Sequence, residues 1–144
     1  MKNSKNLFMD KFTPLIFLDY DGVLQYLSPY PELEPNFQAI RNVIALCEET
    51  NAKIIWITDR LEYNYFLPQA TWFGGLVCGE CDPEYEKSDR LDLWINENFL
   101  PNRFCVLDDS YKFQEYYADV HVWIDPDITF DNKVYYEQAR RLLV

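Results

Sequence analysis

Residues 15–24 read LIFLDYDGVL, an apolar run that ends abruptly in two aspartates separated by one residue and followed by a glycine. Residues 15–19 are predicted to form a buried strand, because the run is short and apolar up to Asp19. An open α/β sheet binds its ligands at the carboxyl ends of its strands, where Asp19 and Asp21 would lie close together. Burying this much like charge is costly unless a cation is bound or the site is catalytic. The pair alone is weak evidence, so its meaning depends on partners elsewhere in the chain.

The composition of the 144-residue chain fits one globular domain, since 49% of its residues are hydrophobic and 17% are aromatic. The net charge of −11 disfavours tight, non-specific binding of nucleic acid, although it is compatible with a local basic groove. No apolar stretch approaches the roughly 20 residues of a membrane span, and the N-terminus lacks the apolar region of a signal peptide. We therefore expect a flexible lead-in at 1–13 and a single domain at 14–144. We also expect a cytoplasmic protein that does not associate with a membrane.

Two of the four cysteines, Cys78 and Cys81, have the C-x-x-C spacing of a zinc site or a redox pair. A structural zinc would need two more ligands. Cys47 and Cys105 occupy apolar positions of a predicted helix and strand, and His121 lies far along the chain. Four reduced and mostly buried thiols are the interpretation that we prefer, and a redox protein stays an alternative that thiol titration tests.

Predicted strands and helices alternate along the chain. Strands are expected at 15–19, 53–58, 76–78, 104–107 and 120–124, and helices at 35–49, 60–67, 88–98, 110–118 and 130–143. The first long helix should bury a face made of Phe37, Ile40, Ile44 and Cys47. Continuously apolar strands with intervening helices indicate a parallel sheet that is covered on both faces. The expected fold is a three-layer α/β/α, Rossmann-like domain with five parallel strands and no sizeable cap domain.

Polar residues follow three of the predicted strands, and a lysine precedes the helix that leads into the fourth strand. In a parallel sheet, all three strand ends lie on one edge of the molecule. The residues expected at this edge are Asp19, Asp21, Thr58, Asp108 and Asp109, with Lys87 beside them. Their order, spacing and strand context agree, which makes the combination much stronger than the first pair of aspartates alone.

These motifs resemble those of the haloacid dehalogenase-like (HAD) superfamily. Its motifs D-x-D-G-[VT]-L, an apolar strand ending in Ser or Thr, a Lys or Arg near a helix start, and an acidic pair after an apolar strand match 19–24, 54–58, Lys87 and 106–109. Arg90 is close enough to compete with Lys87 for the third motif. The resemblance covers about residues 14–143. The chain is most similar to small HAD domains found alone or attached to RNA-repair modules, which share the pattern seen here at Lys87, Leu91, Trp94 and Ile95.

The resemblance implies a phosphatase that depends on Mg²⁺. Asp19 would attack the phosphorus and form an aspartyl-phosphate. Asp21 would protonate the leaving oxygen and later deprotonate the attacking water. The implied metal ligands are Asp19, the backbone carbonyl of Asp21, and Asp108, with Asp109 either bound directly or in the surrounding shell. Asp109 as a helix cap is an equally open alternative.

Three further residues have implied or candidate roles at the phosphate. Thr58 would donate its hydroxyl to a phosphoryl oxygen, and Lys87 would neutralise the charge that develops in the transition state. Asp59 and Arg60 are candidates for contacting the substrate. Asp59 could instead cap the helix expected at 60–67, and Arg60 could be an ordinary surface arginine.

The segments around the first and third motifs are too short to hold a cap domain. An open site suits a bulky substrate, such as a nucleic-acid end or a phosphoprotein, or a protein partner that covers it. Aromatic residues at the rim could stack on bases, although packing within the fold is the interpretation that we prefer for most of them. These aromatic residues are Tyr20, Tyr26, Tyr30, Tyr63, Tyr65 and Trp72. A second hypothesis is a catalytically weak or inactive HAD-like module that acts with a partner protein.

Overall fold

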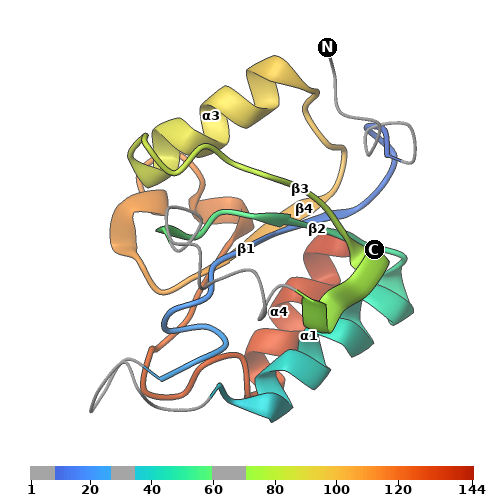
Figure 1. The fold of residues 1–144 in the computed structure, drawn as a ribbon, viewed down its shortest axis with the longest axis vertical. Helices are drawn as coiled ribbons and strands as arrows, with labels where there is room; N and C mark the ends of the chain where they lie inside the picture. The colour runs from blue at the N-terminus through green and yellow to red at the C-terminus, as the bar shows by residue number, and fades with distance from the viewer. Residues whose placement is uncertain (1–8, 27–34, 60–70) are drawn as a thin grey trace.

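The computed structural model of the chain describes residues 9–26, 35–59 and 71–144. A five-stranded sheet forms its centre, with the strand order β3-β2-β1-β4-β5 and parallel pairing throughout (Figure 1). The strands are β1 (Leu15–Leu18), β2 (Lys53–Trp56), β3 (Val77–Glu80), β4 (Phe104–Asp108) and β5 (His121–Trp123). The predicted α/β fold with a parallel five-stranded sheet is therefore confirmed.

Strand β1 lies at the centre of the sheet, between β2 and β4. All four of its residues are fully buried, which explains why this strand is apolar on both faces. Leu18 is in register with Trp56 of β2 and with Leu107 of β4. The residues that directly follow β1 therefore emerge beside the ends of both neighbouring strands.

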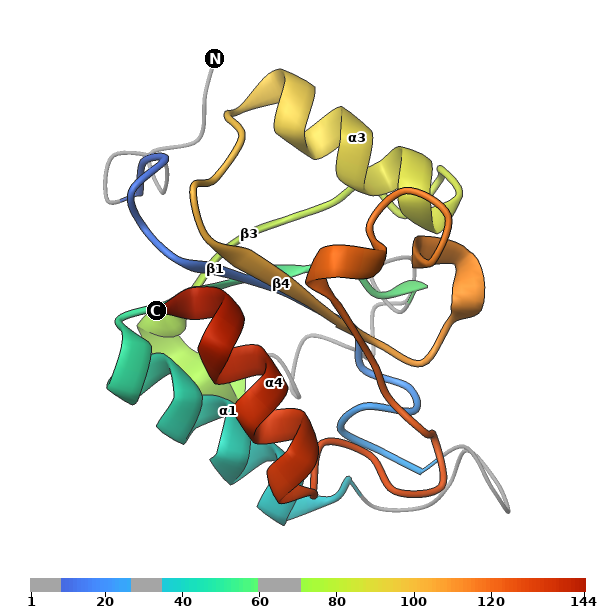
Figure 2. The same ribbon diagram turned by 180° about the vertical axis from the view of Figure 1, so that it is seen from behind.

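Helices cover the sheet on both faces (Figures 1 and 2). Helices α1 (Phe37–Thr50) and α4 (Lys133–Leu143) pack side by side on one face, against a core that includes Ile16 and Leu18. Helix α3 (Lys87–Glu97) covers the other face, where Leu91 and Trp94 pack with Leu15 and Phe17. Alternate residues of β1 thus supply the two halves of the core, as the two-residue period of a strand requires.

The predicted face of α1 is partly wrong. Ile40 and Cys47 are buried as expected, but Phe37 is half exposed, and Ile44 is only partly buried. Phe37 is the first residue of the helix, and its ring meets Trp72 edge-on, with 6.0 Å between the ring centres. The buried face of α1 also includes Ala39, Val43, Leu46 and Thr50.

The helix predicted at 110–118 is also wrong. The chain forms two short 3₁₀ helices instead, η5 (Tyr111–Phe113) and η6 (Ala118–Val120). Only Phe113 is fully buried in this segment, while Tyr111 and Tyr116 are mostly exposed. A continuous α-helix would therefore lack the apolar face whose burial stabilises it.

The other connections differ in detail from the predictions. A 3₁₀ segment, η4 (Thr71–Leu76), precedes β3, and Gly74 adopts a positive φ of 53° where the chain turns. The helix predicted at 60–67 lies outside the described residues. Within the lead-in expected at 1–13, Met9 is buried and the backbone carbonyl of Lys11 accepts a hydrogen bond from the amide of Asn102, so the ordered core starts before Pro14.

No cap domain is present in the described residues. The helices in the described part of the chain include none that is long and apolar enough to cross a membrane. All four cysteines are unpaired by disulfides and buried.

Candidate active site

The candidate site lies where the direction of the chain across the sheet reverses. From β1, the chain moves through α1 to β2 and β3, and then returns through α3 to β4 on the other side of β1. A crevice forms at such a switch point, outside the carboxyl ends of the strands. Asp19 directly follows β1 and Asp108 ends β4, with the amide of Asp19 donating to the carbonyl of Leu107 at 3.0 Å. The fold thus brings residues 89 positions apart to one point.

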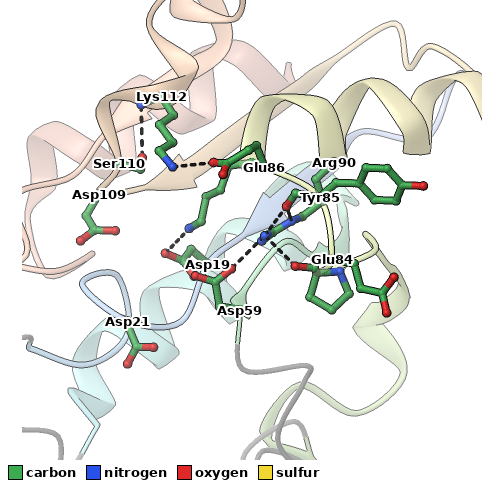
Figure 3. Close-up of a pocket in the computed structure, with 12 residues that line it drawn as sticks. Asp19, Asp21, Asp59, Glu84, Tyr85, Glu86, Arg90, Asp109, Ser110 and Lys112 are labelled. Atoms are coloured by element: carbon green, nitrogen blue, oxygen red, sulfur yellow. Dashed lines mark hydrogen bonds and ion pairs between the residues drawn. The ribbon is translucent and has the colours of Figure 1, made fainter.

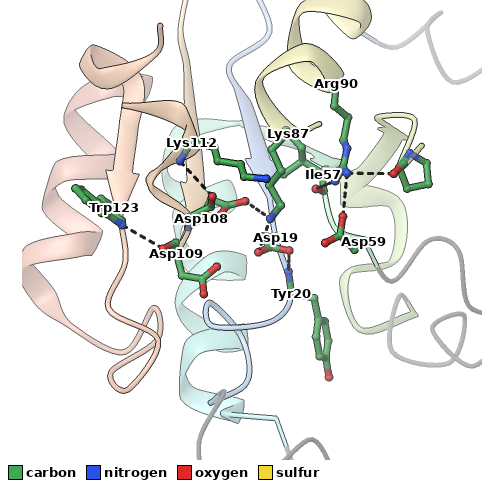
Figure 4. Close-up of polar contacts among 12 residues, drawn as sticks. Asp19, Tyr20, Ile57, Asp59, Lys87, Arg90, Asp108, Asp109, Lys112 and Trp123 are labelled. Atoms are coloured by element: carbon green, nitrogen blue, oxygen red, sulfur yellow. Dashed lines mark hydrogen bonds and ion pairs between the residues drawn. The ribbon is translucent and has the colours of Figure 1, made fainter. Parts of the chain in front are cut away.

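Lys87 joins these two aspartates through its ammonium group. Its Nζ lies 2.8 Å from Oδ2 of Asp19 and 2.6 Å from Oδ2 of Asp108 (Figure 4). The remaining carboxylate oxygens accept backbone hydrogen bonds, from the amide of Tyr20 to Asp19 and from the amide of Ser110 to Asp108. Asp19 is 4% exposed and Asp108 is fully buried, so both carboxylates are held in fixed orientations.

Asp109 completes a group of three carboxylates. One oxygen each from Asp19, Asp108 and Asp109 lies within 4.8 Å of the others. Gly22 packs directly on Asp109, because a Cβ at Gly22 would come within 2.5 Å of the Asp109 Oδ2. Gly22 also has a positive φ of 81°, so both its backbone conformation and this close approach favour glycine.

The electrostatics of the group show more negative charge than Lys87 balances. Burial, with the nearby charge of Asp108, raises the pKa of Asp19 from 3.8 to about 7. Burial raises the pKa of Asp108 to about 6, and burial with the charge of Asp19 raises that of Asp109 to about 6. Burial alone would lower the pKa of Lys87, but the charges of Asp19 and Asp108 raise it above its usual range.

This donor set fits a hard divalent cation. Mg²⁺ and Ca²⁺ prefer carboxylate and carbonyl oxygens, and Mg²⁺ keeps several water molecules in its shell. Three carboxylates beside a single lysine leave surplus negative charge that a cation would neutralise. Burial, more than the neighbouring charges, raises the pKa values of all three aspartates, so without a cation these carboxylates hold protons more tightly than usual.

An open cleft of about 560 Å³ adjoins this group (Figure 3). Besides Asp19, Asp109 and Lys87, its walls are formed by Asp21, Asp59, Pro83, Glu84, Tyr85, Glu86, Arg90, Ser110 and Lys112. The carboxylate of Asp21 lies on the wall, outside the group of three and pointing away from Asp19 (Figure 3). At the rim, Lys112 pairs with Glu86 at 2.6 Å, which links the η5 segment to the start of α3.

The remaining predicted site residues follow β2. Thr58 is fully buried at the carboxyl end of this strand, on the same sheet edge as Asp19. Asp59 is 68% exposed, forms part of the cleft wall, and pairs with Arg90 at 2.8 Å. Arg60 lies outside the described residues.

The sequence left open whether Lys87 or Arg90 is the basic residue of the third motif, and in the structure it is Lys87 that reaches the aspartates. Lys87 contacts the aspartates, whereas the Arg90 guanidinium is buried against backbone carbonyls on the far side of the cleft from Asp109 (Figure 3). The buried position of Arg90 among backbone carbonyls was not predicted from the sequence. Its spacing of three residues from Lys87 was a usable signal, since such residues lie on one face of a helix.

The aromatic residues expected at the rim are buried or partly buried where the structure describes them. Tyr20 is buried, and its ring stacks on that of Trp72 at 6.2 Å between centres. Tyr26 and Trp72 are partly buried. Tyr30, Tyr63 and Tyr65 lie outside the described residues. For Tyr20, packing within the fold is the interpretation that the structure supports.

The doubly covered parallel sheet and the acidic group at its switch point are the features expected of the HAD class of α/β domains, a superfamily that includes many hydrolases and phosphatases. A family model described as the HAD domain in Swiss Army Knife RNA repair proteins matches residues 15–133. The chain belongs to this family, which confirms the resemblance seen in the sequence. Comparisons with curated proteins and with solved structures found no match.

Proposed function

We propose that the protein is a Mg²⁺-dependent phosphatase that acts through an aspartyl-phosphate on Asp19. The observation that carries this proposal is the position of Lys87, which holds Asp19 and Asp108 together at the switch point of the sheet. The proposed nucleophile Asp19, the ammonium group of Lys87 and the three carboxylates that could hold a metal thus lie beside an open cleft. Membership of the HAD family supports the same chemistry.

The proposed reaction has two steps. An oxygen of Asp19 forms a bond to phosphorus while the bond from phosphorus to the leaving oxygen breaks, and Asp21 gives that oxygen a proton. Water then loses a proton to Asp21 and attacks the phosphorus, which releases Asp19 and inorganic phosphate. Lys87 and Thr58 stabilise the charge that develops on the phosphoryl oxygens. In the structure Asp21 points away from Asp19, so this role requires its side chain to turn toward the leaving group.

The metal ligands in this proposal are Asp19, Asp108 and Asp109, with the backbone carbonyl of Asp21. When bound, Mg²⁺ would offset the repulsion between a carboxylate nucleophile and a phosphate dianion. The position of Lys87 between two of the three carboxylates keeps them at a fixed separation for this purpose.

We propose a bulky substrate, because the described part of the chain offers no cap to enclose a small one. The description of the matching family as part of RNA repair proteins supports a phosphorylated nucleic-acid end as the first substrate to test. A phosphoprotein is the alternative, because the net charge of −11 disfavours the binding of nucleic acid. A protein partner could cover the cleft in either case.

The first test is hydrolysis of a generic aryl phosphate with Mg²⁺ by the wild type, Asp19→Asn and Asp119→Asn. Asp119 is exposed in η6 and outside the cleft, so its variant controls for the same chemical change. We expect Asp19→Asn to lose activity by several orders of magnitude and Asp119→Asn to match the wild type. An active Asp19→Asn variant would contradict the mechanism.

A panel of 3′- and 5′-phosphorylated oligonucleotides, phosphopeptides, nucleotides and sugar phosphates tests the substrate. The proposal expects the highest kcat/KM among the large substrates. Equal or better hydrolysis of sugar phosphates would contradict the bulky-substrate proposal. If no substrate is turned over but Mg²⁺ still raises the melting temperature, the inactive binding module becomes the better interpretation.

A further inference from the structure

Arg90 lies one turn beyond Lys87 in α3 and is only 3% exposed. Within the described part of the chain, its guanidinium donates to four acceptors, some of which are seen in Figures 3 and 4. Nη1 donates to the carbonyl of Ile57 at 2.9 Å, and Nε donates to the carbonyl of Tyr85 at 3.0 Å. Nη2 is within hydrogen-bonding distance of the carbonyls of Pro83 and Tyr85 and of the carboxylate of Asp59.

These acceptors come from two segments that carry the proposed phosphate donors. Ile57 and Asp59 are the two neighbours of Thr58, so the guanidinium holds the chain on both sides of that residue. Pro83 and Tyr85 belong to the loop that leads into α3 and therefore to Lys87. Arg90 is thus the point where the carboxyl end of β2 and the start of α3 are joined.

The energetics show that this arrangement is not an ordinary ion pair. Among the described residues, the carboxylate that pairs with Arg90 is that of Asp59, which is 68% exposed, and exposed carboxylates contribute little to such pairs. The charge of Arg90 is therefore accommodated largely by backbone carbonyls in a buried position, which is costly compared with an apolar side chain. The planar guanidinium can reach several acceptors in fixed directions, which the single ammonium group of a lysine cannot do.

We infer that Arg90 is a positioning residue, which fixes Thr58 and Lys87 relative to each other so that both donors meet the transferring phosphoryl group. The inference rests on the proposed phosphatase function. Its physical basis is the strict distance requirement of catalysis, because a misplacement of about 1 Å can cost about a hundredfold in rate. Arg90 acts through the two segments that it joins.

The first experiment measures kcat and KM on an aryl phosphate for Arg90→Lys and Arg90→Ala. Arg41→Ala is the matched control, since Arg41 is an exposed arginine of α1 whose side chain bonds only to Gln38 among the described contacts. We expect kcat of Arg90→Lys to fall ten- to a hundredfold with KM changed less than threefold. Low concentrations of guanidinium chloride, compared with equal NaCl, should restore part of the activity of Arg90→Ala alone. A kcat of Arg90→Lys equal to that of the wild type would overturn the inference.

A second experiment tests how firmly Arg90 holds the two segments, and it does not require catalytic turnover. Hydrogen exchange should become faster at 57–59 and at 83–86 in Arg90→Lys, while β1 and α4 keep the exchange rates of the wild type. Unchanged exchange at either segment would overturn the inference, and a general increase would show that Arg90 acts only on overall stability. If Arg90→Ala does not fold, Arg90→Lys and Arg90→Gln decide by the same measurements.

The two proposals fail in different ways. A wild type without phosphatase activity removes the proposed function, whatever Arg90 does. In that case, the inference is judged by exchange and by calorimetry with inorganic phosphate, for which Arg90→Lys should bind at least tenfold more weakly than the wild type. Equal phosphate affinity in the two proteins would then overturn it.

Discussion

At the scale of single residues, Asp19 is unusual because it is a carboxylate buried next to two others. Its ordinary chemistry would place it on the surface, since a buried charge must be paired or neutralised. Lys87 pairs with it, but the same ammonium also serves Asp108, and Asp109 lies close by. The negative charge of Asp19 is therefore only partly compensated, and binding of a proton or a cation would stabilise the folded protein. The raised pKa of Asp19 reflects this preference for a proton.

The burial of Asp19, together with the nearby charge of Asp108, predicts a pH-dependent stability in buffer without divalent cations. The folded protein holds protons on Asp19 more tightly than the unfolded chain, so the stability contribution is complete below pH 3.8 and is lost as the pH rises to about 7. Each pKa unit corresponds to about 1.4 kcal/mol. Asp19→Asn should therefore melt above Asp119→Asn, by a margin that grows between pH 5 and pH 7.5. Thermal unfolding followed by circular dichroism measures this margin.

The same variants separate the metal from general charge effects. Millimolar Mg²⁺ should raise the melting temperature of Asp119→Asn at pH 7.5 more than that of Asp19→Asn, because only the first variant keeps all three carboxylates. His121, whose pKa burial lowers, is present in both variants and so cancels from the comparison. If the melting temperatures of Asp19→Asn and Asp119→Asn changed with pH in parallel, the prediction of a buried carboxylate with a raised pKa at Asp19 would be contradicted.

At the scale of elements, the caps of the helices join distant parts of the chain. Asn36 caps α1 by accepting hydrogen bonds from the amides of Gln38 and Ala39. Its Nδ2 lies within hydrogen-bonding distance of Thr129 and Asp131, in the loop that leads into α4. Thr129 is fully buried and has a positive φ of 65°, so this loop adopts a conformation that needs support from its neighbours.

The double role of Asn36 predicts graded effects of two substitutions. Asn36→Ala removes the cap and the contacts with the loop, and should lower the free energy of unfolding by about 1–2 kcal/mol. Asn36→Asp keeps the cap acceptor but loses the Nδ2 donor and places a second carboxylate beside Asp131. It should therefore lie between Asn36→Ala and the wild type in its urea midpoint, with Gln38→Ala as the exposed control. Stability of Asn36→Asp equal to that of the wild type would show that the Nδ2 contacts contribute nothing.

At the scale of the whole molecule, the two helical layers enclose the cysteines. Cys47 lies in the layer formed by α1 and α4, and Cys78 and Cys81 lie on the α3 side of the sheet. Burial raises the pKa of Cys47 to about 12, and it raises the pKa values of Cys81 and Cys105 further above their usual range. Thiols of this kind react slowly, because the thiolate is the reactive form.

The cysteines should therefore be inert as long as the protein stays folded. With an aromatic disulfide reagent, we expect slow release of thiol from the native protein and rapid release of four equivalents in urea. The native rate should follow the opening of the fold rather than the pH of the solution. Rapid reaction of Cys78 or Cys81 in the native protein would contradict this picture and favour the redox interpretation.

The strands and the edge that carries the site were predictable from local patterns. Continuous apolar runs indicate strands buried on both faces, and parallel pairing places their carboxyl ends at one edge. Asp19, Thr58 and Asp108 could therefore be assigned to one sheet edge from the sequence, and the structure places all three there. Local patterns failed for 110–118 and for Phe37, because side-chain burial depends on which distant surfaces a segment meets, and no local pattern contains that information.

The sequence alone thus specifies the fold class, the polar residues that follow the strands at one edge of the sheet, and the family. These features depend on local periodicity and short motifs. Only the tertiary structure distinguishes Lys87 from Arg90, although both lie near the start of the same helix. Lys87 reaches Asp19 and Asp108, whereas Arg90 reaches the carbonyls around Thr58 and ahead of α3. The difference arises from packing, since the two side chains meet segments that lie far away in the sequence and come together only when the sheet and its helices assemble.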